Sequence, residues 1–437
     1  MKKLTKAALI ALAAAAAASA EGRTLTEQHI DSVVSSTNII ALGGSDSATG
    51  ADDQAIRERI LTFYYDQFRH SQDPDAPYFL FMSKDGNMLM GIGGTLRMRA
   101  YYDWGGAMPS PAFMPIQIPI PADPLNSKHL GTTPAGTCLF FRMVGRGRHI
   151  GEYQVYIEAN FNGYSARDFH LKKAYGMIGD FTVGYASSTF SDPAAVPPTV
   201  DAGGPNNKMD HTTVLVRYMP RLTRSLLAAV SIENPDTEIG ADGTATRARS
   251  SCMPDFSAML QYSWAPLQHV RASAIVRSLP YRDMEAGLNH SPAGWGVQLS
   301  SVSNPCDAVT VYLTANYGAG YAGMGGDLLA GAYDLIADPD TPGRLYAPRS
   351  FGWNAGVQYN LRHNLFASVS VAQTRFLPSR AVSPDEYKYG LLAMVNAFWN
   401  PLPRFQIGAE FDFARRQNFS SAHRYARRLG LMAQITF

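Results

Sequence analysis

Between residues 150 and 190, apolar and polar side chains alternate along the chain, and this pattern restricts the fold more than any other feature of the sequence. From position 152 to 161 the odd positions hold Tyr, Val, Ile, Ala and Phe, whereas the even positions hold Glu, Gln, Tyr, Glu and Asn. A period of two predicts a β-strand, because successive side chains of a strand point to opposite faces. The short turn Ile178-Gly179-Asp180 then separates two further strands.

Each of these strands has one apolar face that must be covered. In a soluble sheet a second layer of helices or strands covers such a face, and no such layer is evident in the sequence. A closed barrel in a bilayer needs none, because lipid covers its apolar outer face and water fills its polar interior. The pattern therefore favours a transmembrane barrel.

The rest of the chain repeats this pattern. Loops after odd-numbered strands are mostly long and turns after even-numbered strands are short throughout, which is typical of bacterial outer-membrane barrels. We predict an all-β fold, a 16-stranded antiparallel transmembrane β-barrel with an N-terminal periplasmic helical extension. The predicted strands are 88–102, 137–145, 149–161, 168–177, 180–188, 210–219, 223–232, 254–264, 267–278, 291–302, 306–319, 350–361, 364–375, 386–399, 403–414 and 426–437.

Aromatic residues mark the short turns and the end of the chain. Tyr218, Trp264, Tyr359 and Trp399 lie just before such turns, where an aromatic belt reaches the lipid headgroups. The last predicted strand alternates up to Phe437. A final strand that ends in phenylalanine resembles the C-terminal signal of bacterial outer-membrane barrels.

The N-terminal segment predicts export from the cytoplasm. Three lysines precede an apolar run and the small residues up to Ala20, which predicts a signal peptide over residues 1–20. Residues 21–87 are predicted to form a periplasmic extension, in which apolar residues at helical spacing predict an amphipathic helix over about 52–70. The barrel is predicted to occupy residues 88–437.

Charge and cysteine content exclude several classes of function. Cleavage after Ala20 removes three lysines and no acidic residue, so the formal charge changes from +2 to −1, with 35 basic against 36 acidic residues. Without a basic stripe, a near-neutral chain argues against nucleic-acid binding. Cys138, Cys252 and Cys306 are too few and too widely spaced for a disulfide framework or a metal site. We expect free thiols and no cofactor.

Two stretches carry a family resemblance. Residues 169–206, FHLKKAYGMIGDFTVGYASSTFSDPAAVPPTVDAGGPN, resemble the segment that marks the DcaP-like family of trimeric bacterial outer-membrane porins. The segment TLRMRAYYD at residues 95–103 resembles the first strand of that family. The resemblance implies a sixteen-stranded trimeric barrel with an N-terminal periplasmic helical segment. It also implies passive uptake of small, mainly anionic solutes such as dicarboxylates.

The predicted pore lining combines basic strand residues with an acidic loop. The third outer loop, Thr189–Met209, is expected to fold into the lumen, and it carries Asp192 and Asp201. Arginine on the lipid face near the bilayer midplane would cost about 2–4 kcal/mol, so the basic side chains are expected to face inward. An arginine ladder that faces the acidic loop would favour carboxylates, whereas ordinary salt bridges in the lumen would give weak selectivity. The inward-facing candidates are Arg97, Arg99, Arg142, His170, Lys172, Arg217, Arg271 and Arg277.

These observations predict a porin of the bacterial cell outer membrane for passive diffusion of small hydrophilic solutes, with a preference for anions, and not an enzyme. The expected partners are small anionic or neutral solutes, outer-membrane lipid and lipopolysaccharide, and two further copies of the chain in a homotrimer. The alternatives are a monomeric substrate-specific channel and a surface-binding or lipid-acting barrel, the latter suggested by Asn289-His290-Ser291. Calcium binding at Asp334, Asp338 and Asp340 stays open.

Overall fold

The computed structural model describes residues 38–41, 79–83, 87–106, 108, 110–162, 168–238, 245–265, 267–402 and 404–437. The expected signal peptide at 1–20 and the expected helix at 52–70 lie outside these ranges. Among the described residues, no helix is long and apolar enough to cross a bilayer.

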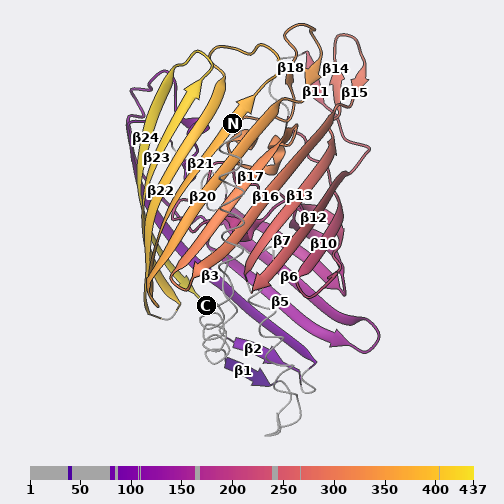
Figure 1. Cartoon of the computed structure of the whole chain (residues 1–437), viewed down its shortest axis with the longest axis vertical. Coiled ribbons are helices and arrows are strands. Elements are labelled where there is room, and N and C mark those ends of the chain that lie inside the picture. Colours follow the sequence, from indigo (N-terminus) through magenta and orange to yellow (C-terminus); the bar gives the residue numbers. More distant parts are fainter. Residues whose placement is uncertain are drawn as a thin grey trace.

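Sixteen strands of the described chain close into one antiparallel barrel (Figure 1). Each strand pairs with the next, and the last pairs with the first, from Arg427 opposite Trp104 to Thr436 opposite Thr95. All sixteen predicted strands are confirmed, with ends that differ by a few residues. They are β3 (Met88–Trp104), β5 (Cys138–Gly147), β6 (Gly151–Asn162), β7 (Asp168–Ile178), β8 (Phe181–Ser187), β9 (Thr212–Tyr218), β10 (Leu226–Glu233), β12 (Asp255–Ala265), β13 (Gln268–Ser278), β16 (Ala293–Cys306), β17 (Val309–Ala319), β20 (Arg349–Arg362), β21 (Leu365–Leu377), β22 (Tyr387–Leu402), β23 (Phe405–Asn418) and β24 (His423–Thr436).

The alternation along β3 places apolar side chains outside and charged side chains inside. Ile92, Leu96 and Met98 are 63%, 52% and 50% exposed, whereas Arg97 and Arg99 are only 6% and 7% exposed. An exposed apolar outer face and a polar interior are the surfaces of a transmembrane barrel.

Three short strands join the sheet outside the sixteen. β1 (Asn38–Ala41) pairs in parallel with β2 (Phe79–Met82), and β2 pairs with the start of β3. β4 (Lys128–Thr133) pairs with the end of β3, while β5 pairs with its beginning. The wall beside β3 is therefore interrupted at residues 134–137, which lie between β4 and β5.

The outer loops carry small elements of their own. At the top of the barrel in Figure 1, strands of the fourth and fifth outer loops form one small sheet, and the sixth outer loop forms a two-stranded hairpin. These and the remaining elements are β11 (Thr246–Ala248), β14 (Tyr281–Asp283), β15 (Asn289–His290), β18 (Ile336–Ala337), β19 (Leu345–Tyr346), α4 (Gly326–Ala330) and the 3-10 turns η1 (Pro115–Gln117), η2 (Pro193–Ala195) and η3 (Ala322–Met324).

Three outer loops share an apolar cluster inside the barrel. Ile116 of the first loop, Phe190 and Met209 of the third, and Tyr321 and Leu328 of the sixth are all buried in it. The first, third and sixth outer loops therefore pack against one another in the space that the barrel strands enclose.

Candidate functional site

The third outer loop, residues 188–211 between β8 and β9, is hydrogen-bonded to the far wall of the barrel. Its backbone oxygens at residues 190, 198 and 207 accept bonds from Ser273 Oγ of β13 (2.7 Å), Asn396 Nδ2 of β22 (2.8 Å) and Asn316 Nδ2 of β17 (3.1 Å). These strands belong to the part of the wall that runs from β13 to β24. The loop therefore lies inside the barrel against that part.

Asp192 attaches the start of this loop to β13 and β16. Its Oδ2 lies 2.9 Å from His269 Nε2 and also accepts a hydrogen bond from Ser300 Oγ. Arg271 Nη1 lies 3.4 Å from Asp192 Oδ1 and donates to Ser191 O at 2.9 Å. Asp192 and Arg271 are both buried, so this ion pair holds the loop to the wall.

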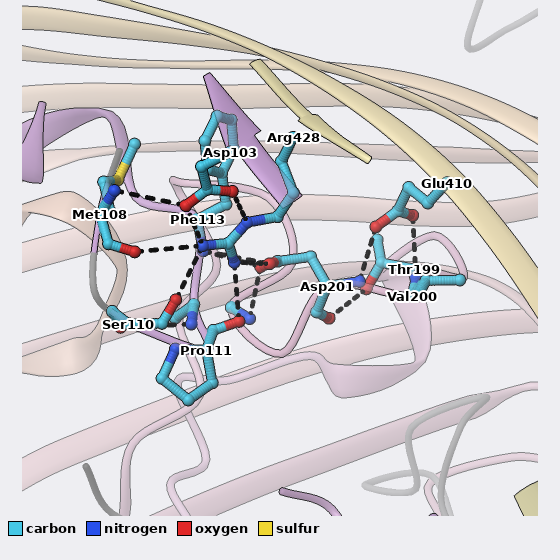
Figure 2. A network of polar contacts seen from close by, with 12 residues as sticks. Asp103, Met108, Ser110, Pro111, Phe113, Thr199, Val200, Asp201, Glu410 and Arg428 are labelled. Atoms are coloured by element: carbon cyan, nitrogen blue, oxygen red, sulfur yellow. Dashed lines mark hydrogen bonds and ion pairs between the residues drawn. The ribbon is translucent and has the colours of Figure 1, made fainter. Parts of the chain in front are cut away.

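Asp201 attaches the middle of the loop to the closing strand β24 (Figure 2). Arg428 Nη1 donates to Asp201 Oδ2 at 2.8 Å, and Arg428 Nε donates to Asp103 Oδ1 at 2.6 Å. Asp103 lies directly opposite Arg428 in the register of β3 and β24. The Arg428 guanidinium also lies 4.0 Å from the centre of the Tyr101 ring. One arginine thus joins both ends of the barrel sheet to the loop.

Glu410 of β23 binds the same part of the loop through its backbone. Its carboxylate accepts the N–H groups of Val200 at 2.9 Å and Asp201 at 2.6 Å (Figure 2). Asn396 Nδ2 donates to it as well, at 2.8 Å. Two residues further along β23, Asp412 is buried, and neither of its oxygens has a hydrogen-bond partner in the described part of the chain.

A cavity of about 550 Å³ lies on the other side of the loop. It is bounded by loop residues such as Pro193, Val196 and Thr199 and by the wall from β3 to β9. Most of the charged side chains that line it are cationic, namely Arg97, Arg99, Lys172, Lys173 and Lys208, with Asp210 as the acidic one; His170 also lines the cavity.

Some of these cations have partners in the wall or loop. Lys172 Nζ lies 2.8 Å from Glu158 Oε1, and Lys208 Nζ lies 2.9 Å from Asp210 Oδ2. Arg97 Nε donates to Gln434 Oε1 at 2.7 Å, and Arg99 donates to the backbone oxygen of Ala135, where the wall beside β3 is interrupted. Among the lining residues, five are arginine or lysine and only Asp210 is acidic, so the lining has an excess of positive charge.

A β-bulge brings two consecutive lysines to this cavity. In the pairing of β6 with β7, Glu158 lies opposite Lys173 and Ala159 lies opposite Leu171, so Lys172 has no opposite residue. Such an extra residue reverses the alternation beyond it. Strict alternation assigns only Lys172 to the lumen, whereas Lys173 lines the cavity as well.

The ten predicted site residues fall into two groups. Arg97, Arg99, His170 and Lys172 line the cavity. The others are buried in wall and loop contacts: Arg142 with Gln154, Arg217 with Thr189 and Ser187, Arg277 with Asp255 and Asp334, Arg271 with Asp192, and Asp201 with Arg428.

Sequence reasoning missed Lys173, Lys208 and Arg428 as candidates. Arg428 alternates with the outward Leu429 in the last strand, so the same period-two argument points it inward. Lys208 lies in the irregular third loop, where no periodicity gives a direction.

The sixth outer loop holds a buried carboxyl that contacts the third. Asp327 of α4 accepts hydrogen bonds at Oδ2 from Tyr387 Oη (2.6 Å) and Asn206 Nδ2 (2.8 Å). Burial raises the pKa of Asp327 from 3.8 to about 6, although these hydrogen bonds oppose the rise.

The possible calcium ligands and the Asn289-His290-Ser291 motif make contacts of other kinds. Asp334 contacts Arg277 at 2.9 Å, whereas Asp338 and Asp340 both contact Arg380. The ring of His290 lies 5.1 Å from that of Tyr281. In the described residues, no group of three acidic, histidine or cysteine side chains is arranged to hold a metal ion.

Solved structures with a similar arrangement include bacterial outer-membrane proteins. The outer membrane channel DcaP of Acinetobacter baumannii matches with a TM-score of 0.69 at 20% identity, over 82% of this chain and 99% of that one. The chain has the DcaP fold. This match confirms the fold that the resemblance of residues 169–206 implies.

Two more distant structures share the DcaP-like barrel. An anion-selective porin from Comamonas acidovorans matches with a TM-score of 0.51 at 10% identity, over 80% of this chain and 100% of that one. The outer membrane protein OmpT of Vibrio cholerae matches with a TM-score of 0.51 at 9% identity, over 80% and 98%. No family model matches the sequence, and no curated protein matches it.

Proposed function

We propose that the protein is a DcaP-like porin of the bacterial outer membrane, through which small hydrophilic solutes diffuse passively. The support is a barrel with an apolar outer face and a polar interior, together with the fold of the outer membrane channel DcaP. As a porin, the protein binds its solutes weakly in passing and needs neither a catalyst nor a cofactor.

The third outer loop narrows this pore. Three aspects of the loop support this role. Its buried acids are paired with the far wall, its backbone is bonded to β13, β17 and β22, and a cavity of about 550 Å³ lies on its other side. Solutes then pass between the loop and the wall from β3 to β9.

The pore favours anions. The observation that carries this proposal is the set of cationic side chains around the cavity, Arg97, Arg99, Lys172, Lys173 and Lys208. A cleft lined by one sign of charge raises the local concentration of the opposite ion. Arg97 and Arg99 can in addition bind a carboxylate with two parallel hydrogen bonds. The anion-selective porin with the same fold is consistent with this preference.

The acidic loop residues have a different role from the one expected. Asp192 and Asp201 pair with Arg271 and Arg428 of the far wall, so they fix the loop to that wall. The solute then passes the cationic lining of the cavity on the other side of the loop. Assembly as a homotrimer is part of the proposal, supported by a trimer form of OmpT of Vibrio cholerae, which shares the fold. The signal peptide and the periplasmic extension stay predictions.

A swelling assay on proteoliposomes tests the function. Glucose, gluconate and glucosamine have similar size and different charge, and we expect gluconate to enter fastest and glucosamine slowest. The double variant Arg97→Gln, Arg99→Gln should lose most of this order, and Arg282→Gln, on an exposed outer loop, should keep it. Liposomes that stay impermeable to all three solutes would refute the porin, and faster entry of glucosamine would refute the anion preference.

A further inference from the structure

The outward face of the last four strands carries a row of arginines at its outer-loop end. Arg375 of β21, Arg415 of β23 and Arg427 of β24 alternate with the buried, inward side chains of Phe376, Ala414 and Arg428. They therefore point away from the lumen. We name Arg375, Arg415 and Arg427 the outer arginine cluster.

Aromatic rings hold this cluster together across the strands. Tyr389 lies opposite Arg375, and Tyr425 lies opposite Arg415. The Tyr389 ring centre is 5.4 Å from the Arg375 guanidinium and 5.6 Å from that of Arg415, which also lies 5.6 Å from the Tyr425 ring. Arg427 lies over the ring of Phe413 at 5.9 Å. Tyr389 of β22 thus lies between Arg375 and Arg415, and the stacked rings of Phe413 and Tyr425 connect Arg415 to Arg427. Neighbouring strands are about 5 Å apart, so the three cations are spread over β21 to β24.

No carboxylate on these strands balances the cluster. The acidic residues of β21 to β24 are Glu410 and Asp412, and both are buried inside the barrel. The hydrogen-bond acceptors within reach are neutral: Arg375 Nε donates to Gln373, and Arg415 Nη2 donates to Gln417. The Arg375 and Arg427 side chains are exposed. The outer arginine cluster thus has donors and positive charge available to an anion.

The position of the cluster identifies the source of that anion. On β24, the outward residues that follow Arg427 toward the C-terminus are Leu429, Leu431, Ala433 and Ile435. Eight residues of a tilted strand rise roughly 20 Å from Ile435 to Arg427, so Arg427 lies near the edge of an apolar band about 25 Å tall. Trp104, an aromatic typical of the lipid interface, lies opposite Arg427. The cluster therefore lies at the headgroups of the outer leaflet.

We propose that Arg375, Arg415 and Arg427 bind the phosphate groups of outer-leaflet glycolipid headgroups. Charge-assisted, forked hydrogen bonds from arginine match phosphate oxygens. A phosphate free in solution has no reason to concentrate on the lipid-facing side, whereas a phosphorylated lipid is held there by its acyl chains. The inference is independent of the pore, because the cluster is on the opposite side of the wall from the cavity.

The test measures lipid retained by the purified protein. Protein in detergent micelles is mixed with bis-phosphorylated lipid A or with its enzymatically dephosphorylated form, and bound lipid is counted by native mass spectrometry. We expect the triple variant Arg375→Gln, Arg415→Gln, Arg427→Gln to retain about tenfold less bis-phosphorylated lipid. Inorganic phosphate at millimolar concentration should not displace the lipid. The matched control is Arg247→Gln, Arg249→Gln, Arg282→Gln, which removes three exposed arginines from the outer loops.

Each outcome decides for or against the site. Equal retention by the triple variant and the control overturns the proposal. Loss of the oligomer with unchanged lipid retention also overturns it, since the cluster would then be a subunit contact. Displacement by inorganic phosphate would assign the site to a soluble anion. If the triple variant does not fold, Arg415→Lys should retain more lipid than Arg415→Gln, and equal retention by these two variants contradicts the site.

Discussion

Arg428 of the last barrel strand donates to Asp201 Oδ2 at 2.8 Å and to Asp103 Oδ1 at 2.6 Å. This arginine therefore connects the strand pair that closes the barrel to the loop that lies inside it. All three side chains are buried, so their charges are compensated mainly by one another.

Removal of this arginine should loosen the third outer loop. Arg428→Met leaves Asp103 and Asp201 buried without their cation, and breaking a buried ion pair in this way costs about 3–5 kcal/mol. We expect a lower temperature for the heat-induced shift in gel mobility and a larger, noisier single-channel conductance. Arg282→Met, on an exposed outer loop, is the control. A conductance and transition temperature equal to those of the parent protein would show that the loop does not depend on Arg428.

The buried carboxyl of Asp327 predicts a pH dependence of stability. Burial raises the pKa of Asp327 to about 6 in the folded protein, against 3.8 without burial. The unfolded chain then releases its proton first, so this group makes the fold less stable as pH rises from about 4 to 6. The loss is roughly 3 kcal/mol for a shift of about two pH units.

Asp327→Asn removes this titration. We expect the difference in thermal midpoint between the variant and the parent protein to move in favour of the variant as pH rises from 4 to 7. Asp340→Asn, at a mostly exposed carboxyl, should show no such trend. A difference that is constant with pH, or that moves toward the parent protein, would contradict the assignment.

Gly326 should be intolerant of a side chain for two separable reasons. Its φ is +66°, and a Cβ there would lie 2.4 Å from Asn206 O of the third outer loop. Gly326→Ala should therefore destabilise the protein by more than about 1 kcal/mol and displace the loop. Gly287→Ala is the matched control, because Gly287 has a φ of +69° and its nearest other atom is 3.5 Å away, on Arg282.

Conductance distinguishes the two effects. Both alanine variants should show a lower thermal midpoint, but only Gly326→Ala should change the single-channel conductance. The same conductance change in both variants would mean that the contact with Asn206 is unimportant.

The bulge in β7 predicts that two consecutive lysines act on the pore. Because both Lys172 and Lys173 line the cavity, Lys172→Gln and Lys173→Gln should each lower the permeability of chloride relative to potassium. Lys388→Gln, whose amine lies over the ring of Phe419, should not. If only one of the two lysines had an effect, a regular strand would describe β7 better than the bulged one.

The sequence predicts the barrel well because its signal is local. A period of two along β6 and short turns after even-numbered strands depend on neighbouring residues alone. The bulge at Lys172 and the short strand β4 depend on pairing with other strands, so strict alternation cannot place them. The two-stranded hairpin of the sixth loop, β18 and β19, is too short for a periodic signal.

In the candidate site, too, the directions of strand residues were predictable and the contacts of loop residues were not. Alternation correctly places Arg97 and Arg99 inside the barrel. It gives no direction for a loop, so the attachment of Asp192 to β13 and of Asp201 to β24 required long-range structure. The acidic loop and an inward-facing Arg271 were predicted, but Arg428, which pairs with Asp201, was not.

The reversal potential in a potassium chloride gradient tests the central claim most directly. For the purified protein in a planar bilayer, we expect a stable conductance and a reversal potential whose sign shows that chloride is more permeable than potassium. The double variant Arg97→Gln, Arg99→Gln should bring the potential close to zero. No conductance at all, or a potential of the sign given by potassium, would contradict an anion-favouring pore lined by these arginines.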